Sequence, residues 1–94
     1  MNAAEAESLL GDNGRPTVLV VEDEVLVRLL IADELRFTGF RVVEAISADE
    51  ALSVLRSSRH IDVLLTDVRM PGSMDGIELA KVVAETWPEM KIVL

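Results

Sequence analysis

Residues 63–67 read Val-Leu-Leu-Thr-Asp, an apolar run that ends in a carboxylate. An unbroken apolar run of this length is typical of a β-strand covered on both faces, as in a parallel sheet. Residues 68–72 (VRMPG) contain a proline and a glycine, which end the strand and turn the chain. Ligands and reactive groups of α/β folds gather where parallel strands end. Asp67 therefore has two interpretations, as the cap of a turn or helix or as a functional carboxylate.

Strands and helices are predicted to alternate along the chain. The predicted strands cover residues 17–21, 41–45, 63–66 and 91–94. Helices are expected from 24 to 38, from 47 to about 57–58, and from 75 to the Trp87-Pro88 pair, since proline cannot continue a helix. The order β-α-β-α-β-α-β predicts an α/β fold, a parallel sheet with right-handed crossovers.

Apolar spacing and capping residues define the expected helix faces. Gly39 suits the left-handed position that ends a helix, and Asp75 is a plausible N-cap. Ser47 and Glu50 have the S-x-x-E pattern of a capping box. Leu26 and Leu29 lie off the first helix's apolar stripe and are either peripheral packing or a contact surface. The residues expected to face the core are Val27, Leu30, Ile31 and Leu35 in the first helix, Ala51, Leu52 and Leu55 in the second, and Leu79, Val82, Val83 and Thr86 in the third.

Length and composition limit the class of protein. The chain has 94 residues, enough for one domain, and half of them are apolar. The 17 acidic and 9 basic residues give a net charge of −8, which argues against nucleic-acid binding. There is no cysteine, no signal-peptide pattern and no apolar run of transmembrane length, so we expect a cytoplasmic domain with no membrane contact. Residues 1–16 are expected to form a flexible tail before the domain at 17–94.

Carboxylates end two of the predicted strands. Glu22 and Asp23 follow the first strand, and Asp67 follows the third. The carboxyl ends of parallel strands point the same way, so these three side chains converge if the two strands are neighbours. Each pair about 4 Å apart then repels by roughly 1 kcal/mol in water and about 4 kcal/mol near a protein surface. An oxygen-only site of this kind suits Mg²⁺ better than zinc.

Three sequence motifs together resemble a known family. VLVVEDE (18–24), VLLTDVRMPG (63–72) and MDGIELA (74–80) are similar to the receiver domain of two-component response regulators. The resemblance runs from about Thr17 to Leu94. It implies a flavodoxin-like, doubly wound fold whose family sheet order is 2-1-3-4-5, shortened here to 2-1-3-4.

The resemblance also implies residue roles. Asp67 would accept a phosphoryl group from the phosphohistidine of a sensor histidine kinase or histidine phosphotransfer protein. Asp23 would ligate Mg²⁺ directly, Glu22 would assist through water, and the backbone carbonyl of Arg69 would supply another oxygen. Such a domain is a regulatory phosphoacceptor and not a conventional enzyme.

Some positions depart from the family pattern. Glu22 stands where the family more often has Asp, and Ser73 is one residue more than the commonest loop contains. Arg69 lies near the expected path of the hydrolytic water. The family's fourth helix, fifth strand and fifth helix, with its switch Ser/Thr and Lys, are not in the sequence. We therefore expect an unpaired fourth strand and a first helix without a neighbour. We favour the interpretation that the sequence is a fragment of a longer receiver; the alternative is a sheet completed by a partner, in a homodimer or strand swap.

Other functions compete with this interpretation. A degenerate receiver could serve as a binding or dimerisation module without phosphorylation. Haloacid-dehalogenase-like phosphatases also use an aspartyl nucleophile, but they carry a second Asp at the position of Arg69. Dinucleotide binding is disfavoured because no G-x-G-x-x-G follows the first strand. His60 has no partner pattern and is assigned a structural or solvated role.

Overall fold

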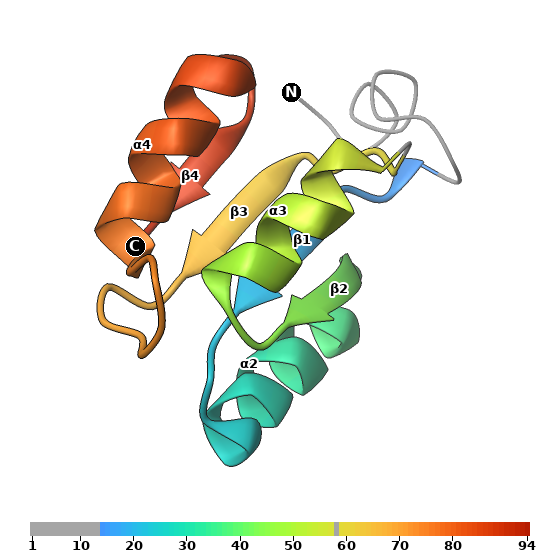
Figure 1. Ribbon diagram of the computed structural model, residues 1–94. Coiled ribbons are helices and arrows are strands. Elements are labelled where there is room, and N and C mark those ends of the chain that lie inside the picture. Colours follow the sequence, from blue (N-terminus) through green and yellow to red (C-terminus); the bar gives the residue numbers. More distant parts are fainter. Residues whose placement is uncertain (1–13, 58) are drawn as a thin grey trace.

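The computed structural model describes residues 14–57 and 59–94, which form alternating strands and helices (Figure 1). The predicted tail over 1–16 falls mostly on residues 1–13 and so lies outside this part. The elements are β1 (Thr17–Val21), α2 (Val25–Thr38), β2 (Arg41–Ala45), α3 (Ala48–Arg56), β3 (Val63–Thr66), α4 (Gly76–Thr86) and β4 (Lys91–Val93). Each predicted element is present, with ends within one or two residues of those expected.

The four strands form one parallel sheet in the order β2-β1-β3-β4. β1 is central and pairs with β2 on one side and β3 on the other, with Val21 opposite both Ala45 and Thr66. This confirms the flavodoxin-like α/β fold and the order 2-1-3-4. The order reverses direction between β1 and β3, and such a switch point is where open α/β sheets bind ligands.

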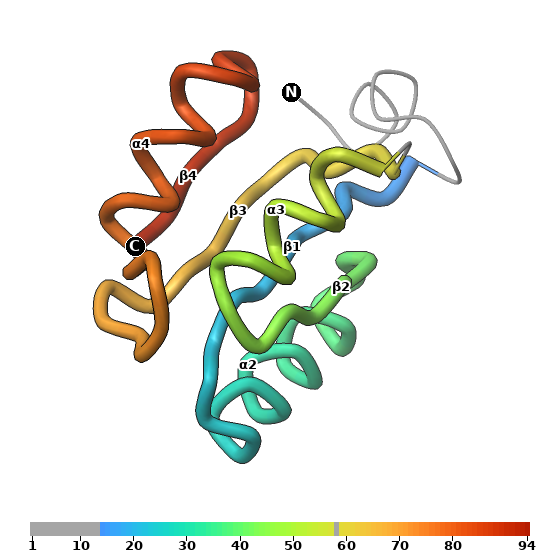
Figure 2. The backbone as a smooth tube through the Cα atoms, in the orientation of Figure 1, coloured from blue at the N-terminus to red at the C-terminus, as the bar shows by residue number. Residues whose placement is uncertain are grey.

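The helices lie on both faces of the sheet, as the backbone trace shows (Figure 2). Leu19 and Val21 of β1 join the core cluster with buried residues of α3 and α4. Side chains alternate along a strand, so Val18 and Val20 point to the opposite face, where α2 packs against β1 and β2. The larger core is therefore between the sheet and the α3–α4 pair, and it is built from Leu19, Val21, Leu52, Leu55, Leu64, Leu79 and Val83.

The helix ends follow the predicted local chemistry with one change. Gly39 ends α2 at φ 109°, and the Asp75 carboxylate caps α4 in a reciprocal pair with Glu78. The Ser47 hydroxyl accepts the Glu50 N–H at 3.1 Å, as expected. However, the Glu50 carboxylate accepts the N–H of Ile46 at 3.3 Å, one residue before the position that a capping box requires.

The expected inner faces of α2 and α4 are partly wrong. Val27 and Leu30 are exposed at 37% and 72%, and the only fully buried residue of α2 is Ala32. Leu26 is 76% exposed and Leu29 42%, so neither is covered by packing within the described residues. Thr86 at the end of α4 is exposed as well, although Leu79 and Val83 are buried as predicted. The sheet therefore covers only part of the apolar face of α2.

His60 lies at the opposite end of the sheet from the strand-end carboxylates. Its Nε2 is 2.7 Å from one oxygen of Asp62, whose other oxygen accepts the N–H of Thr17 at 2.7 Å. This pair fixes the start of β1, in agreement with a structural role. Among the described residues no helix is both long and apolar enough to cross a membrane.

Candidate functional site at the carboxyl ends of β1 and β3

The site begins just beyond the ends of β1 and β3, where the hydrogen bonds between the strands continue for one more residue. The N–H of Glu22 donates to the Ala45 carbonyl at 3.1 Å, and the N–H of Asp67 donates to the Val21 carbonyl at 3.1 Å. These two hydrogen bonds anchor the backbone of Glu22 to β2 and that of Asp67 to β1. Both residues are therefore placed by the sheet itself.

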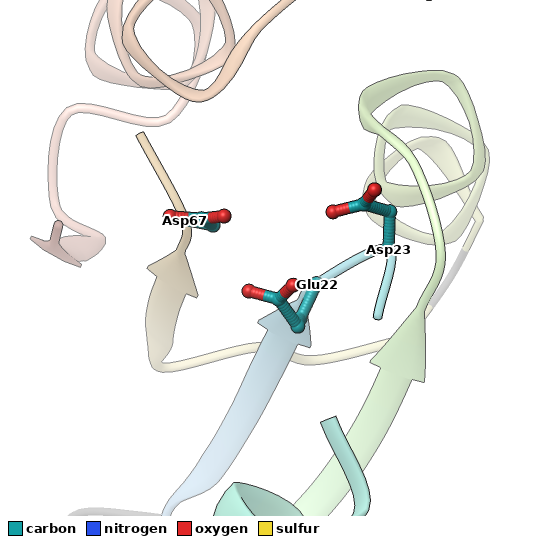
Figure 3. A group of neighbouring side chains, drawn as sticks. All are labelled: Glu22, Asp23 and Asp67. Carbon is teal, nitrogen blue, oxygen red and sulfur yellow. The ribbon is translucent and has the colours of Figure 1, made fainter. Parts of the chain in front are cut away.

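Three carboxylates meet at this edge, as the sequence predicts. Glu22, Asp23 and Asp67 each offer one oxygen, and these oxygens lie within 4.8 Å of one another. Figure 3 shows the side chains of Asp23 and Asp67 facing each other across the two strand ends, with the Glu22 carboxylate beside them. Glu22 is buried, Asp23 half-buried and Asp67 exposed. Asp67 is thus the most accessible carboxylate to an incoming molecule.

The carboxylate of Glu22 is held in an environment that disfavours its charge. Burial raises its pKa above the ordinary value of 4.5, and the negative charges of Asp67 and Asp23 raise it further. The N–H of Glu24, which donates to Glu22 Oε1 at 3.1 Å, acts in the opposite direction. The excess negative charge of the cluster therefore favours binding of a cation.

Asp67 is oriented by its own loop. The N–H of Val68 donates to Asp67 Oδ1 at 2.8 Å, and the Thr66 hydroxyl donates to the Asp67 carbonyl at 3.0 Å. α4 begins against this segment, with the N–H of Gly76 donating to the Val68 carbonyl at 3.0 Å. The loop that leaves Asp67 thus returns to it within nine residues, and this closed turn limits where the carboxylate can lie.

Comparison with known proteins identifies the family. A family model for the response regulator receiver domain matches residues 18–94. The chain belongs to this family. It is a receiver domain of two-component systems, and its family is regulatory.

Individual relatives agree with the family assignment. The receiver is 38% identical over 92 residues to the two-component response regulator ORR11 of Oryza sativa subsp. japonica, covering 98% of this chain and 62% of that protein. It is 40% identical over 75 residues to the sensor histidine kinase RcsC of Escherichia coli strain K12, covering 80% of this chain and 8% of that protein. It therefore spans less than two thirds of either relative.

A solved structure resembles the fold closely. The response regulator TrrA of Thermotoga maritima, crystallised in complex with Mg²⁺-BeF, matches with a TM-score of 0.78 and 33% sequence identity. The match covers 84% of this chain and 67% of that one.

The acidic cluster of this receiver fits a hard divalent cation. Oxygen ligands at about 2.1 Å from Mg²⁺ lie about 3 Å apart when adjacent and about 4.2 Å when opposite. The 4.8 Å limit on the separation of the three carboxylate oxygens is larger than these values, so the three groups would have to move slightly together, or bind through a bridging water, to share one ion. All the donors are oxygens, which matches the preference of Mg²⁺.

The loop after Asp67 carries two further predicted features. Arg69 is exposed, and the participation of its carbonyl in a metal site stays a prediction. Ser73, the extra loop residue, donates from its hydroxyl to the Asp49 carboxylate at 3.3 Å. The longer loop is thus linked to the first turn of α3.

Sequence reasoning missed Arg28, a half-buried residue of α2. Its Nη1 donates to the Glu22 carbonyl at 3.0 Å, and its Nε is 3.2 Å from the Glu44 carboxylate on β2. The signal in the sequence is one charged residue between apolar neighbours, since the stretch reads Val27-Arg28-Leu29. That signal indicates an unusual position but does not say what the guanidinium contacts.

Proposed function

We propose that Asp67 accepts a phosphoryl group from the phosphohistidine of a sensor histidine kinase or histidine phosphotransfer protein, in a Mg²⁺-dependent reaction. The observation that carries this proposal is the meeting of three carboxylates from two adjacent strand ends, with oxygens within 4.8 Å and Asp67 the exposed member. The domain then acts as a conformational switch and not as a conventional enzyme.

The chemistry requires a positioned nucleophile. One carboxylate oxygen of Asp67 attacks the phosphorus atom of the donor. The phosphorus–nitrogen bond breaks, its electron pair stays on the imidazole, and the imidazole takes up a proton. The product at Asp67 is a mixed anhydride that water can hydrolyse, which suits a transient signal. Because phosphoryl transfer depends mostly on positioning and charge neutralisation, the hydrogen bond from the Val68 N–H to Asp67 contributes directly to the reaction.

The acidic residues have complementary roles in this proposal. Asp23 and Asp67 would hold the metal directly, Glu22 would assist through water, and the Arg69 carbonyl would supply a further oxygen. When bound, Mg²⁺ neutralises the charge between the anionic carboxylate and the anionic phosphoryl group. Asp67 is exposed, so the side of the site that the donor must approach is open. The cysteine-free sequence suits a reducing compartment, so we propose the cytoplasm as its location.

The alternative is a degenerate receiver that binds a partner or a second copy without phosphorylation. The observation in its favour is the apolar surface of α2, where Leu26, Leu30 and Phe37 are 76%, 72% and 89% exposed. An exposed patch of this kind marks many interaction sites. The same patch suits a donor protein that docks beside Asp67, so phosphorylation decides between the two functions.

Chemical mapping of the acceptor tests the proposal. The protein is incubated with a small acyl phosphate and Mg²⁺, then treated with borohydride, which reduces an aspartyl phosphate to homoserine. Peptide mass spectrometry should find homoserine at position 67 only, and none when the metal is chelated. Homoserine at another aspartate would transfer the acceptor role to that residue, and no homoserine would favour the binding module.

A further inference from the structure

Arg28 connects the acidic site to the edge strand of the sheet. Its guanidinium donates through Nη1 to the Glu22 carbonyl at 3.0 Å and pairs through Nε with Glu44 at 3.2 Å. Glu44 lies on β2, opposite Val20 of β1 in the strand register. One side chain of α2 therefore bridges the end of β1 and a neighbouring strand.

We propose that Arg28 is a positioning residue for the acidic site, and that it sets the direction in which Glu22 and Asp23 present their carboxylates. The inference rests on the proposed function, because it assumes that the residues oriented by Arg28 bind Mg²⁺. The peptide plane that contains the Glu22 carbonyl also contains the N–H of Asp23. A hydrogen bond to that carbonyl therefore fixes the orientation of the chain as it enters Asp23.

The backbone of Glu22 is held from two directions. Its N–H donates to Ala45 of β2, and its carbonyl accepts from Arg28 of α2. The backbone N–H of Arg28 also donates to the Glu24 carbonyl, at 2.9 Å. This hydrogen bond connects Arg28 to the end of the segment between β1 and α2. Arg28 thus contacts both ends of the 22–24 segment, once through its side chain and once through its backbone.

The guanidinium is itself immobilised. Its side chain is only 13% exposed, and Glu44 binds it with one carboxylate oxygen while the other oxygen accepts from Arg36 Nη2 at 3.1 Å. A planar guanidinium holds two acceptors at a fixed angle, which a flexible ammonium group does not. Groups that orient metal ligands in this way influence metal affinity strongly, although they never touch the ion.

Arg36 provides a matched control for the experiment. It binds the same carboxylate of Glu44 from the exposed side, with 45% of its side chain exposed, and also lies 3.7 Å from Asp33. Among the described hydrogen bonds, it makes none to residues 22–24. Arg28→Gln and Arg36→Gln both remove a positive charge from the ion-pair network around Glu44, but only Arg28→Gln also removes a hydrogen bond to Glu22.

Two measurements test the positioning role, one with and one without metal. Calorimetric titration with Mg²⁺ should show about ten-fold weaker binding for Arg28→Gln, as for other residues that orient ligands, little change for Arg36→Gln, and an intermediate value for Arg28→Lys. Amide hydrogen exchange in metal-free protein should be faster at Glu24, whose N–H donates to Glu22, in Arg28→Gln but not in Arg36→Gln.

The outcomes separate this inference from the proposed function. Equal effects of the two glutamine variants on both measurements would overturn the positioning role. If the unmodified protein binds no Mg²⁺, the metal-dependent function is wrong, and the exchange rate at Glu24 alone decides the role of Arg28. If Arg28→Gln does not fold, Arg28→Lys replaces it, and unchanged binding and exchange in that variant would count against the proposal.

Discussion

The backbone carbonyl of Asp67 occupies the space where a side chain at position 76 would begin. A Cβ built on Gly76 would lie 1.7 Å from the Asp67 oxygen and 2.8 Å from its carbonyl carbon. Gly76 is the first residue of α4 and is buried. The absence of a side chain at Gly76 therefore lets α4 begin directly against the backbone of Asp67.

This contact predicts the effect of adding one methyl group. Gly76→Ala should lower the free energy of unfolding by at least about 2 kcal/mol, because the clash is with backbone and the loop or helix must move. It should also weaken Mg²⁺ binding through displacement of Asp67. Urea denaturation and calorimetric titration measure the two effects.

Gly39→Ala is the control for that substitution. Gly39 has φ 109° with nothing within 4 Å of an added Cβ, and it lies at the end of α2. Backbone strain should lower its stability by about 1–2 kcal/mol, with Mg²⁺ binding unchanged. Gly76→Ala with normal stability and normal metal binding would show that the close approach to Asp67 does not constrain the site.

The raised pKa of Glu22 predicts how the stability of the metal-free protein depends on pH. The folded protein keeps the Glu22 proton to higher pH than the unfolded chain, so unfolding releases a proton between the two pKa values. Stability therefore falls as pH rises from the ordinary value of 4.5, until the folded-state pKa is passed. Glu22→Gln lacks the carboxylate and so does not lose stability in this way. The difference between its melting temperature and that of the unmodified protein should therefore increase as pH rises over the same range.

Thermal melts in a chelator, at a series of pH values from 4.5 to neutrality, measure that difference. Added Mg²⁺ should reduce the advantage of Glu22→Gln, because the ion stabilises a protein more the more tightly it binds, and the variant lacks the carboxylate that assists binding. If the difference in melting temperature stays constant or shrinks as pH rises, the surroundings of Glu22 in the folded protein do not raise its pKa.

The exposed apolar surface of α2 predicts a difference between protein and small-molecule donors. Leu26 is three residues beyond Asp23 and 76% exposed, so a protein that brings a phosphohistidine to Asp67 would contact it. Leu26→Gln should slow transfer from a histidine kinase or phosphotransfer protein by about ten-fold, the loss expected for a contact worth more than 1 kcal/mol. Uptake from a small acyl phosphate should not change.

Phe37→Gln offers the comparison at the far end of the same helix. Phe37 is 89% exposed and larger than leucine, so its replacement removes at least as much apolar surface. Timed transfer from a donor protein that phosphorylates the unmodified receiver measures both variants. Equal transfer rates for Leu26→Gln and the unmodified protein would exclude the start of α2 from the docking surface.

The acidic cluster could be predicted from sequence because it depends only on strand order. Glu22 and Asp67 follow recognisable strands, and the parallel alternation of strands and helices directs both strand ends to one edge. Adjacency of β1 and β3 was the single further condition, and the observed order meets it. The cap at Asp75 was predictable for a similar reason, since it depends on residues within one turn.

Features that depend on coverage or long side chains were not predictable. The apolar spacing of α2 identifies its hydrophobic side, but burial depends on what else packs there, so Val27 and Leu30 were placed wrongly. Arg28 contacts Glu22, at the end of the preceding strand, and Glu44, on the following strand, and nothing in its immediate neighbours specifies these two contacts. The Glu50 carboxylate accepts from the N–H of Ile46 because a flexible side chain can reach either of two adjacent backbone donors.

Intact mass spectrometry before and after incubation with a small phosphodonor and Mg²⁺ tests the central claim most directly. We predict one phosphoryl increment on the unmodified protein, and none on Asp67→Asn or when the metal is chelated. Asp75→Asn is the control, because its amide oxygen can still cap α4 while the acidic cluster is intact. An increment that persists in Asp67→Asn, or none on the unmodified protein, would contradict Asp67 as the phosphoacceptor.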